Sequence, residues 1–194
     1  MGDANYTDIV VNGDQHQRNA NVLGCSRPLA KSFLYAILFG AGDAKLGQTL
    51  YGVSNAQKGK QARKKFMANL PGFERLVNNL KDVFKEYGCI PGLDGRKVYS
   101  RSDYQVLNYL LQSAEGITCK AAVSYAMKKI EEEGLDAYPV IFYHDEQAWC
   151  SSEADAARVG EILSESFREA PKEFGVMCMD GGDYVVGRSY AEVH

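Results

Sequence analysis

Apolar residues recur at helical spacing in the stretch 103–133, at Val106, Leu107, Leu110, Leu111, Ala114 and Ile117. The sequence as a whole predicts that residues 1–26 are polar and irregular and that four helices follow, over residues 27–39, 55–69, 72–87 and 103–133. Ser26 is a suitable N-cap and Pro28 fits a first helical turn, so the first helix is predicted to begin at Arg27. The glycines of Gly40-Ala41-Gly42 are predicted to end it.

Strand patterns occur in two places. The stretch from Ile90 to Ser100 holds short β-prone pieces around Asp94-Gly95, which indicates a hairpin. Residues 139–143 form an apolar run that meets His144-Asp145-Glu146, and residues 148–150 resume the run, as expected for strand, tight turn and strand. A helix over 153–170 and two short terminal strands complete the prediction. Helices followed by a small antiparallel sheet with a covering helix make the fold class α+β.

Charge is divided unevenly along the chain, although the net charge is only −3. Residues 27–101 contain 14 Lys and Arg against 5 Asp and Glu, whereas residues 131–194 contain 4 against 15. This division favours a basic face for a polyanion, and it is also compatible with two solvated helix faces. No apolar run reaches the roughly 18 residues of a membrane helix, so no membrane partner is expected. The five scattered cysteines indicate reduced thiols inside a cell.

Arg27, Lys31, Tyr35 and Phe39 are spaced four apart, so they form one row along the first predicted helix. Two cations near a helix N-terminus add to the positive end of the helix dipole, an arrangement that an anion would neutralise. A triphosphate could place its phosphates on Arg27 and Lys31 and its base and sugar against Tyr35. The spacing alone also fits an ordinary amphipathic helix.

Two further groups have chemistry that suits a polymerase, although each has an ordinary explanation. Asp145 and Glu146 lie at a tight turn and offer the hard oxygen ligands that Mg²⁺ prefers, but Asp is common in turns. Asn108 and Gln112 share a helix face, and two neutral amides suit contacts with minor-groove acceptors at any base pair. They could equally be a pair of surface amides.

The string from Arg27 through Gly40 resembles motif B of the family A DNA polymerases, R-x3-K-x3-[FY]-x3-[YF]-G, and its continuation to Gln48 resembles the phage replicative branch. His144-Asp145-Glu146 resembles motif C of the same family. Residues 93–98 and 107–114 are similar to the same phage polymerases, and Asp14 and His16 resemble the family's D-x-H element. Pro28 is unusual within motif B, and Phe39 stands where the family more often has Tyr.

The resemblance implies a role in DNA replication and a division into a lead-in (1–26), helical fingers (27–88) and the C-terminal part of a palm (89–194). It implies that Arg27, Lys31, Tyr35 and Phe39 bind the incoming dNTP and that Tyr35 eases acceptance of nucleotides lacking a 3′-hydroxyl. Asp145 is then the metal ligand in a site for two Mg²⁺ ions, and Glu146 is an accessory carboxylate. The expected catalytic residues are Asp145, Glu146 and Lys31.

The resemblance also implies which residues contact DNA. His144 is expected at the primer terminus, and Asn108, Gln112 and Arg96 are expected along the primer-template. If the chain is encoded by a phage, its expected location is the cytoplasm of the infected host.

The family's motif A, which carries the second metal-binding Asp, does not occur in the sequence. Because Met1 follows the point where motif A would lie, we expect a split polymerase whose N-terminal partner polypeptide supplies it, although a fragment or an interrupted gene would look identical. The chain alone is expected to be inactive, since one carboxylate cluster cannot hold both ions. Two alternatives stay open: part of a single-subunit RNA polymerase, against which Glu146 argues, and a non-catalytic DNA-binding module derived from a polymerase.

Overall fold

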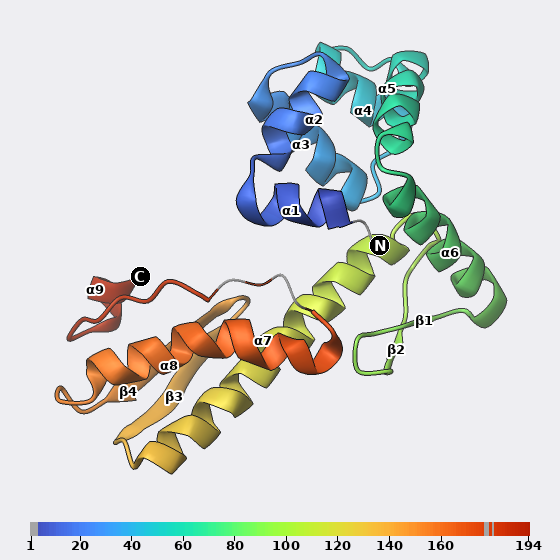
Figure 1. Cartoon of the computed structure of the whole chain (residues 1–194). Coiled ribbons are helices and arrows are strands. Elements are labelled where there is room, and N and C mark those ends of the chain that lie inside the picture. Colours follow the sequence, from blue (N-terminus) through green and yellow to red (C-terminus); the bar gives the residue numbers. More distant parts are fainter. Residues whose placement is uncertain (1–3, 177–178, 180) are drawn as a thin grey trace. The chain divides into compact units, whose positions relative to one another are not determined.

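The computed structural model describes residues 4–176, 179 and 181–194, and the chain divides into two compact units (Figure 1). The N-terminal unit comprises the described residues up to Gly92 together with 96–111, and the C-terminal unit comprises 93–95 and the described residues from Gln112 onward. Helix α7 (Val106–Glu133) begins in the first unit and continues in the second. Helices and two small antiparallel sheets make up both units, which confirms the α+β class.

The N-terminal unit is mainly helical. Its elements are α1 (Ala4–Asn12), α2 (Gln15–Leu23), α3 (Arg27–Leu38), α4 (Asp43–Tyr51), α5 (Ala56–Ala68), α6 (Pro71–Tyr87), β1 (Ile90–Pro91) and β2 (Lys97–Val98). The predicted helices over 27–39, 55–69 and 72–87 are confirmed as α3, α5 and α6, and the predicted hairpin over 90–100 is confirmed as the antiparallel pair β1–β2.

The prediction that residues 1–26 are irregular is wrong, because this stretch contains α1 and α2. Asp14 caps α2 by accepting hydrogen bonds from the backbone N–H groups of His16 and Gln17, and Gly24 ends it at φ 72°. Few residues of these helices are buried, so their apolar signal is weak. Helix α4 was likewise not predicted. It packs against α5 so closely that a Cβ on Gly59 would overlap the carbonyl oxygen of Asp43.

Aromatic side chains form the centre of the N-terminal unit. Phe33 and Phe66 are almost fully buried and meet edge to face with ring centroids 5.8 Å apart, and Phe66 meets Phe73 in the same way at 6.3 Å. Leu46 and Ile90, from α4 and β1, are also fully buried in this core. The core therefore ties helix α3 to every later helix of the unit.

The C-terminal unit is built on the second half of α7. It also contains the hairpin β3 (Ala137–Tyr143) and β4 (Glu146–Ser151), helix α8 (Ala156–Glu169), the 3₁₀ helix η1 (Ala170–Phe174) and the short helix α9 (Tyr190–Val193). The predicted strand, turn and strand are confirmed: β3 and β4 pair antiparallel, and Tyr143 lies opposite Glu146. The predicted long helix and the helix over 153–170 are confirmed as α7 and α8. The two terminal strands are wrong, because the described residues after Phe174 form no strand and instead include α9.

A smaller core holds the C-terminal unit together. Ala126 and Ile130 of α7 pack against Val159 and Ile162 of α8, with Trp149 of β4 half-buried beside them. Figure 1 shows α8 beside the hairpin and the second half of α7. The segment after 180 runs along α8, where a Cβ on Gly160 would overlap the ring of Tyr184, so this glycine permits the close approach.

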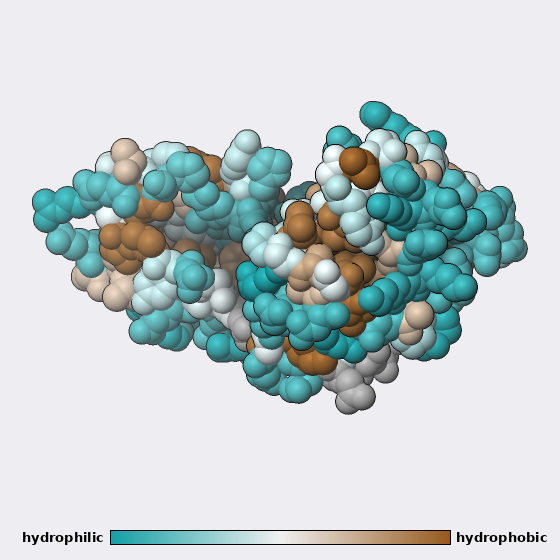
Figure 2. Space-filling model, turned by 90° about the horizontal axis from the view of Figure 1, so that it is seen from above, coloured by the Kyte–Doolittle hydropathy of each residue, from teal (hydrophilic) through white to brown (hydrophobic). Residues whose placement is uncertain are grey.

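The surface in Figure 2 is mostly hydrophilic and carries scattered hydrophobic patches. Among the described residues, no helix is long and apolar enough to cross a membrane. The described cysteines are all free thiols, and Cys178 lies outside the described residues.

Candidate functional site

Helix α3 presents the predicted row on its exposed side. Arg27, Lys31, Tyr35 and Phe39 are all exposed, and the rings of Tyr35 and Phe39 stack with centroids 6.4 Å apart and planes 22° apart. Ala30, Phe33, Leu34 and Ile37 occupy the opposite, buried side of the helix. Burial of the apolar side in the core therefore fixes which way the cationic and aromatic side chains face. Ser26 occupies the N-cap position, but its side chain makes no capping hydrogen bond.

The start of α2 contacts the row at two places, which sequence reasoning did not foresee. The Asp14 carboxylate accepts a hydrogen bond from Arg27 Nε at 2.7 Å, and the ring of His16 lies 6.4 Å from that of Tyr35. The hydrogen bond from Arg27, followed by that from the backbone of Gln17, holds the pKa of the Asp14 carboxyl below its usual range. The spacing Asp-x-His was visible in the sequence, but nothing local indicated which residues it would meet.

The carboxylate turn connects β3 to β4 with two residues. His144 and Asp145 form the turn, and Glu146 is the first residue of β4. His144 has φ 54°, a left-handed conformation that is uncommon outside glycine and suits a two-residue hairpin turn. Its ring meets that of Tyr143 at 4.3 Å. The turn therefore exposes Asp145 to solvent at the tip of the hairpin.

Glu146 has a partner from the far end of the sequence. His194 Nδ1 lies 3.1 and 3.2 Å from the two carboxylate oxygens of Glu146, and the His194 ring stacks on Tyr190 at 5.0 Å. Both side chains of the pair are partly exposed. The sequence did not predict this contact, because it arises only where the segment after α8 returns to the hairpin.

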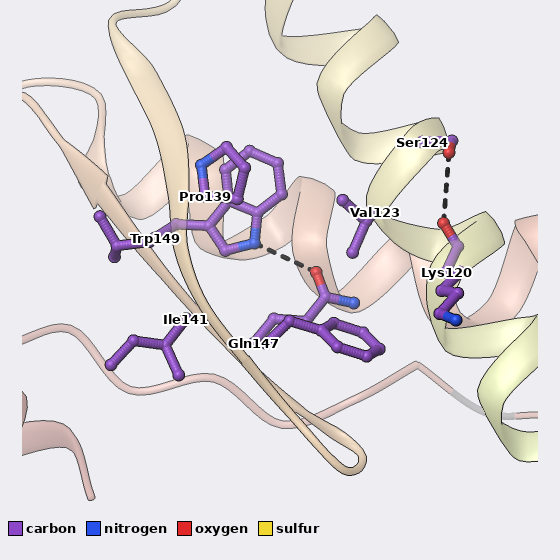
Figure 3. A pocket seen from close by; sticks show the side chains of 9 residues that line it. Lys120, Val123, Ser124, Pro139, Ile141, Gln147 and Trp149 are labelled. Atoms are coloured by element: carbon purple, nitrogen blue, oxygen red, sulfur yellow. Dashed lines mark hydrogen bonds between the residues drawn. The ribbon is translucent and has the colours of Figure 1, made fainter.

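The hairpin is joined to α7 by polar contacts beside a pocket (Figure 3). Gln147 donates from Nε2 to the Cys119 carbonyl oxygen of α7 at 3.4 Å, and its own side-chain oxygen accepts from the Trp149 indole N–H at 3.1 Å. Figure 3 shows this pair of side chains between the hairpin and Val123 of α7. Burial first, and then the negative charges of Glu115 and Asp145, raise the pKa of the Cys119 thiol on α7.

Comparison with known proteins decides the family. The chain matches the family model described as DNA polymerase family A over residues 12–191. This chain belongs to DNA polymerase family A. The DNA-directed DNA polymerase of Enterobacteria phage T3 is 31% identical over 97% of this chain and 30% of its own length. That of Escherichia phage Phieco32 is 31% identical over 97% of this chain and 32% of its own length.

A solved structure has the same fold. The polymerase domain of Pol1 from M. smegmatis, in complex with a DNA primer-template and dNTP, aligns with a TM-score of 0.73 at 17% identity. The alignment covers 86% of this chain and 33% of that one. The chain thus spans about a third of the length of the family A relatives that it matches.

The other residues predicted to contact DNA in this family A chain belong neither to the row on α3 nor to the carboxylate turn. Asn108 and Gln112 both lie on α7, where Asn108 is half-buried and Gln112 is exposed. Arg96 is exposed in the turn between β1 and β2, and its carbonyl oxygen accepts a hydrogen bond from the Gly92 N–H at 2.8 Å. The roles of these residues stay predictions, as does the division of the family A chain into fingers and palm.

The metal site predicted from the family A resemblance consists of the carboxylates at the start of β4 and in the turn before it. Asp145 and Glu146 are adjacent carboxylates, the ligand type that Mg²⁺ takes; Asp145 is exposed, whereas Glu146 is half-buried and both of its oxygens face His194 Nδ1. Across the described residues, no three His, Cys, Asp or Glu side chains form a group that could hold a metal ion. The two carboxylates therefore fit Mg²⁺ as part of a ligand set.

Proposed function

We propose that this chain is the nucleotide-binding and motif C part of a DNA-directed DNA polymerase that works on a primer-template with dNTPs and Mg²⁺. The observation that carries the proposal is the exposed row on α3, with two cations followed by two stacked rings. Arg27 and Lys31 would bind the phosphates, and Tyr35 and Phe39 would contact the base and sugar. The same residues occur in the order of motif B, in a chain that belongs to family A.

Asp145 would bind Mg²⁺ with Glu146 as an accessory carboxylate, and His144 would contact the primer terminus. Mg²⁺ held there would stabilise the negative charge on the attacking and leaving oxygens of phosphoryl transfer. Two ions about 3.5–4 Å apart require more than one fixed carboxylate. We propose that a segment carrying motif A, outside these 194 residues, completes the site, and that the chain alone does not extend primers.

The DNA contacts follow the same proposal. Asn108 and Gln112, one turn apart on α7, would read minor-groove acceptors that are common to all base pairs. Arg96 would contact the backbone of the primer-template. Because none of these contacts distinguishes one base from another, they suit an enzyme that copies any sequence.

The test is reconstitution. The chain is mixed with a polypeptide from the same genome that carries motif A, and primer extension is measured with Mg²⁺. We expect extension by the pair and by neither polypeptide alone. Lys31→Ala and Asp145→Ala should each lower the extension rate by at least about 100-fold, as removal of a group that stabilises developing charge does. Lys128→Ala, which removes an exposed lysine from α7 outside the basic stretch 27–101, is the matched control and should change little.

Two results would contradict the proposal. One is a pair that binds DNA but extends no primer, and the other is an Asp145→Ala pair that is as active as the unmodified pair. The second would favour a non-catalytic DNA-binding module. Comparing ribonucleotides with deoxyribonucleotides in the active pair separates an RNA polymerase from a DNA polymerase.

A further inference from the structure

Asp14 is held rigidly at the N-terminus of α2. Its Oδ1 accepts from the backbone N–H groups of His16 at 3.0 Å and Gln17 at 2.9 Å. The other oxygen, Oδ2, accepts from Arg27 Nε at 2.7 Å. One carboxylate thus performs two tasks, because one oxygen caps a helix while the other binds a side chain of the nucleotide row.

The contact with Arg27 uses only one part of the guanidinium. The hydrogen bond is made by Nε, and no hydrogen bond from either Nη atom to a described residue is found. A guanidinium held at Nε keeps the two terminal nitrogens for a second acceptor, and paired N–H groups match the oxygens of a phosphate. The Asp14 contact therefore restrains the side chain without blocking the end that would bind a nucleotide.

His16, two residues after Asp14, lies beside the aromatic end of the same row. The His16 ring lies 6.4 Å from that of Tyr35, with the planes tilted by 38°. Tyr35 is one turn beyond Lys31 on α3, and α2 and α3 pack together. The start of α2 thus contacts both the phosphate-binding end and the aromatic end of the row. Lys31, between them, forms no ion pair with any described residue.

We infer that Asp14 is a positioning residue, which holds the Arg27 guanidinium in advance in the orientation that binds the nucleotide triphosphate. This inference rests on the proposed function, since it assumes that the row binds a triphosphate. A free arginine loses much rotational freedom when it binds a ligand, and an arginine already restrained in the free protein loses less. The hydrogen bond from Arg27 is the first cause of the lowered pKa of the Asp14 carboxyl, as expected for a carboxylate that binds a guanidinium.

The direction in which Asp14→Asn changes triphosphate affinity distinguishes this positioning role from a purely electrostatic one. Asp14→Asn keeps a side-chain oxygen that can cap α2, because Asn and Asp cap helices equally well. It removes the negative charge and turns an N–H group toward Arg27 Nε. If Asp14 only repelled the triphosphate or competed for Arg27, this substitution would strengthen binding. If Asp14 positions Arg27, it must weaken binding despite removing a repulsive charge.

The experiment measures binding of inorganic triphosphate and of one dNTP to the complete 194-residue chain by NMR titration. Asp14→Asn should raise both Kd values by about 3- to 10-fold, the range expected for one immobilised side chain. Asp14→Ser, which also caps helices, should do the same. In an Arg27→Ala background the Asp14→Asn effect should vanish. The Arg27 Nε–H resonance should broaden or shift in Asp14→Asn before any ligand is added.

The matched control is Asp82→Asn, which removes a negative charge from the exposed side of α6 and should leave both Kd values unchanged. If Arg27→Ala and Lys31→Ala weaken binding while both Asp14 variants bind equally or more tightly, the positioning role is overturned and the proposed function stands. If neither Arg27→Ala nor Lys31→Ala affects triphosphate binding, the proposed nucleotide row fails, and the positioning role fails with it.

Discussion

The two units bury their apolar side chains to very different extents. In the N-terminal unit, Phe33, Phe66 and Leu46 are almost fully buried in a core that includes every helix from α3 to α6. In the C-terminal unit, the core is a small cluster between α7 and α8, and β3 carries a run of exposed large side chains. These are Tyr138, Val140, Ile141, Phe142 and Tyr143.

This difference indicates that the N-terminal unit is stabilised more strongly by its own core than the C-terminal unit is. Buried apolar area is the main favourable term in folding, and an isolated two-stranded hairpin is marginally stable in water. The α3 row therefore stands on a well-packed support, whereas the carboxylate turn lies at the tip of a hairpin with little buried surface. The single tryptophan, Trp149, belongs to β4, so its fluorescence reports on the C-terminal unit alone.

The largest change in stability is expected when one phenylalanine from each unit is replaced with alanine and the two losses are compared. Phe66→Ala should lower the free energy of unfolding of the N-terminal unit by about 3–5 kcal/mol, because the side chain is 1% exposed and leaves a cavity. Phe142→Ala should lower the stability of the C-terminal unit by only about 1 kcal/mol, because this residue is 43% exposed and loses less buried apolar area. Hydrogen exchange resolved by residue measures both. Equal losses would show that the contrast between the units is wrong.

A smaller effect is expected at the hairpin turn. His144→Val should destabilise the hairpin by about 1–2 kcal/mol, because a β-branched residue tolerates φ 54° poorly. His144→Gly should be neutral or slightly stabilising, since glycine adopts positive φ freely. Denaturant unfolding followed by Trp149 fluorescence measures both variants. If the two variants are equally stable, the positive φ at position 144 does not constrain the turn.

The mildest change is expected on acidification. Hydrogen bonds from the Ser152 hydroxyl and the Asp136 backbone N–H hold the pKa of the Asp155 carboxyl below its usual range. Because the folded pKa is the lower one, this contribution to stability is complete above the unfolded pKa of about 4 and is lost as pH falls through the folded pKa. Trp149 fluorescence should therefore report a loss of stability below about pH 4. Asp155→Asn should flatten that pH dependence, and an unchanged pH profile would contradict this assignment.

Local patterns were sufficient for much of the fold. The helices α3, α5, α6, α7 and α8 and both hairpins were predictable from apolar periodicity, caps and turn residues, because each signal lies within a few residues of its effect. The misses have two causes. Helix α4 has Leu46 and Leu50 buried but is only nine residues long, so it gives few repeats of the apolar pattern. In α1 and α2 few large apolar residues are buried, and the segment after η1 packs against α8. Such packing leaves little trace in local sequence.

The same division applies to the candidate site. The row on α3 and the turn that exposes Asp145 were predictable from the sequence, because helical spacing and hairpin geometry follow from neighbouring residues. The contact of Asp14 with Arg27, thirteen residues away, and that of His194 with Glu146, forty-eight residues away, depend on how the chain packs. These residues meet because α2 packs against α3 and because the segment after α8 returns to the hairpin. Residue spacing along the chain does not indicate which distant residues such packing brings together.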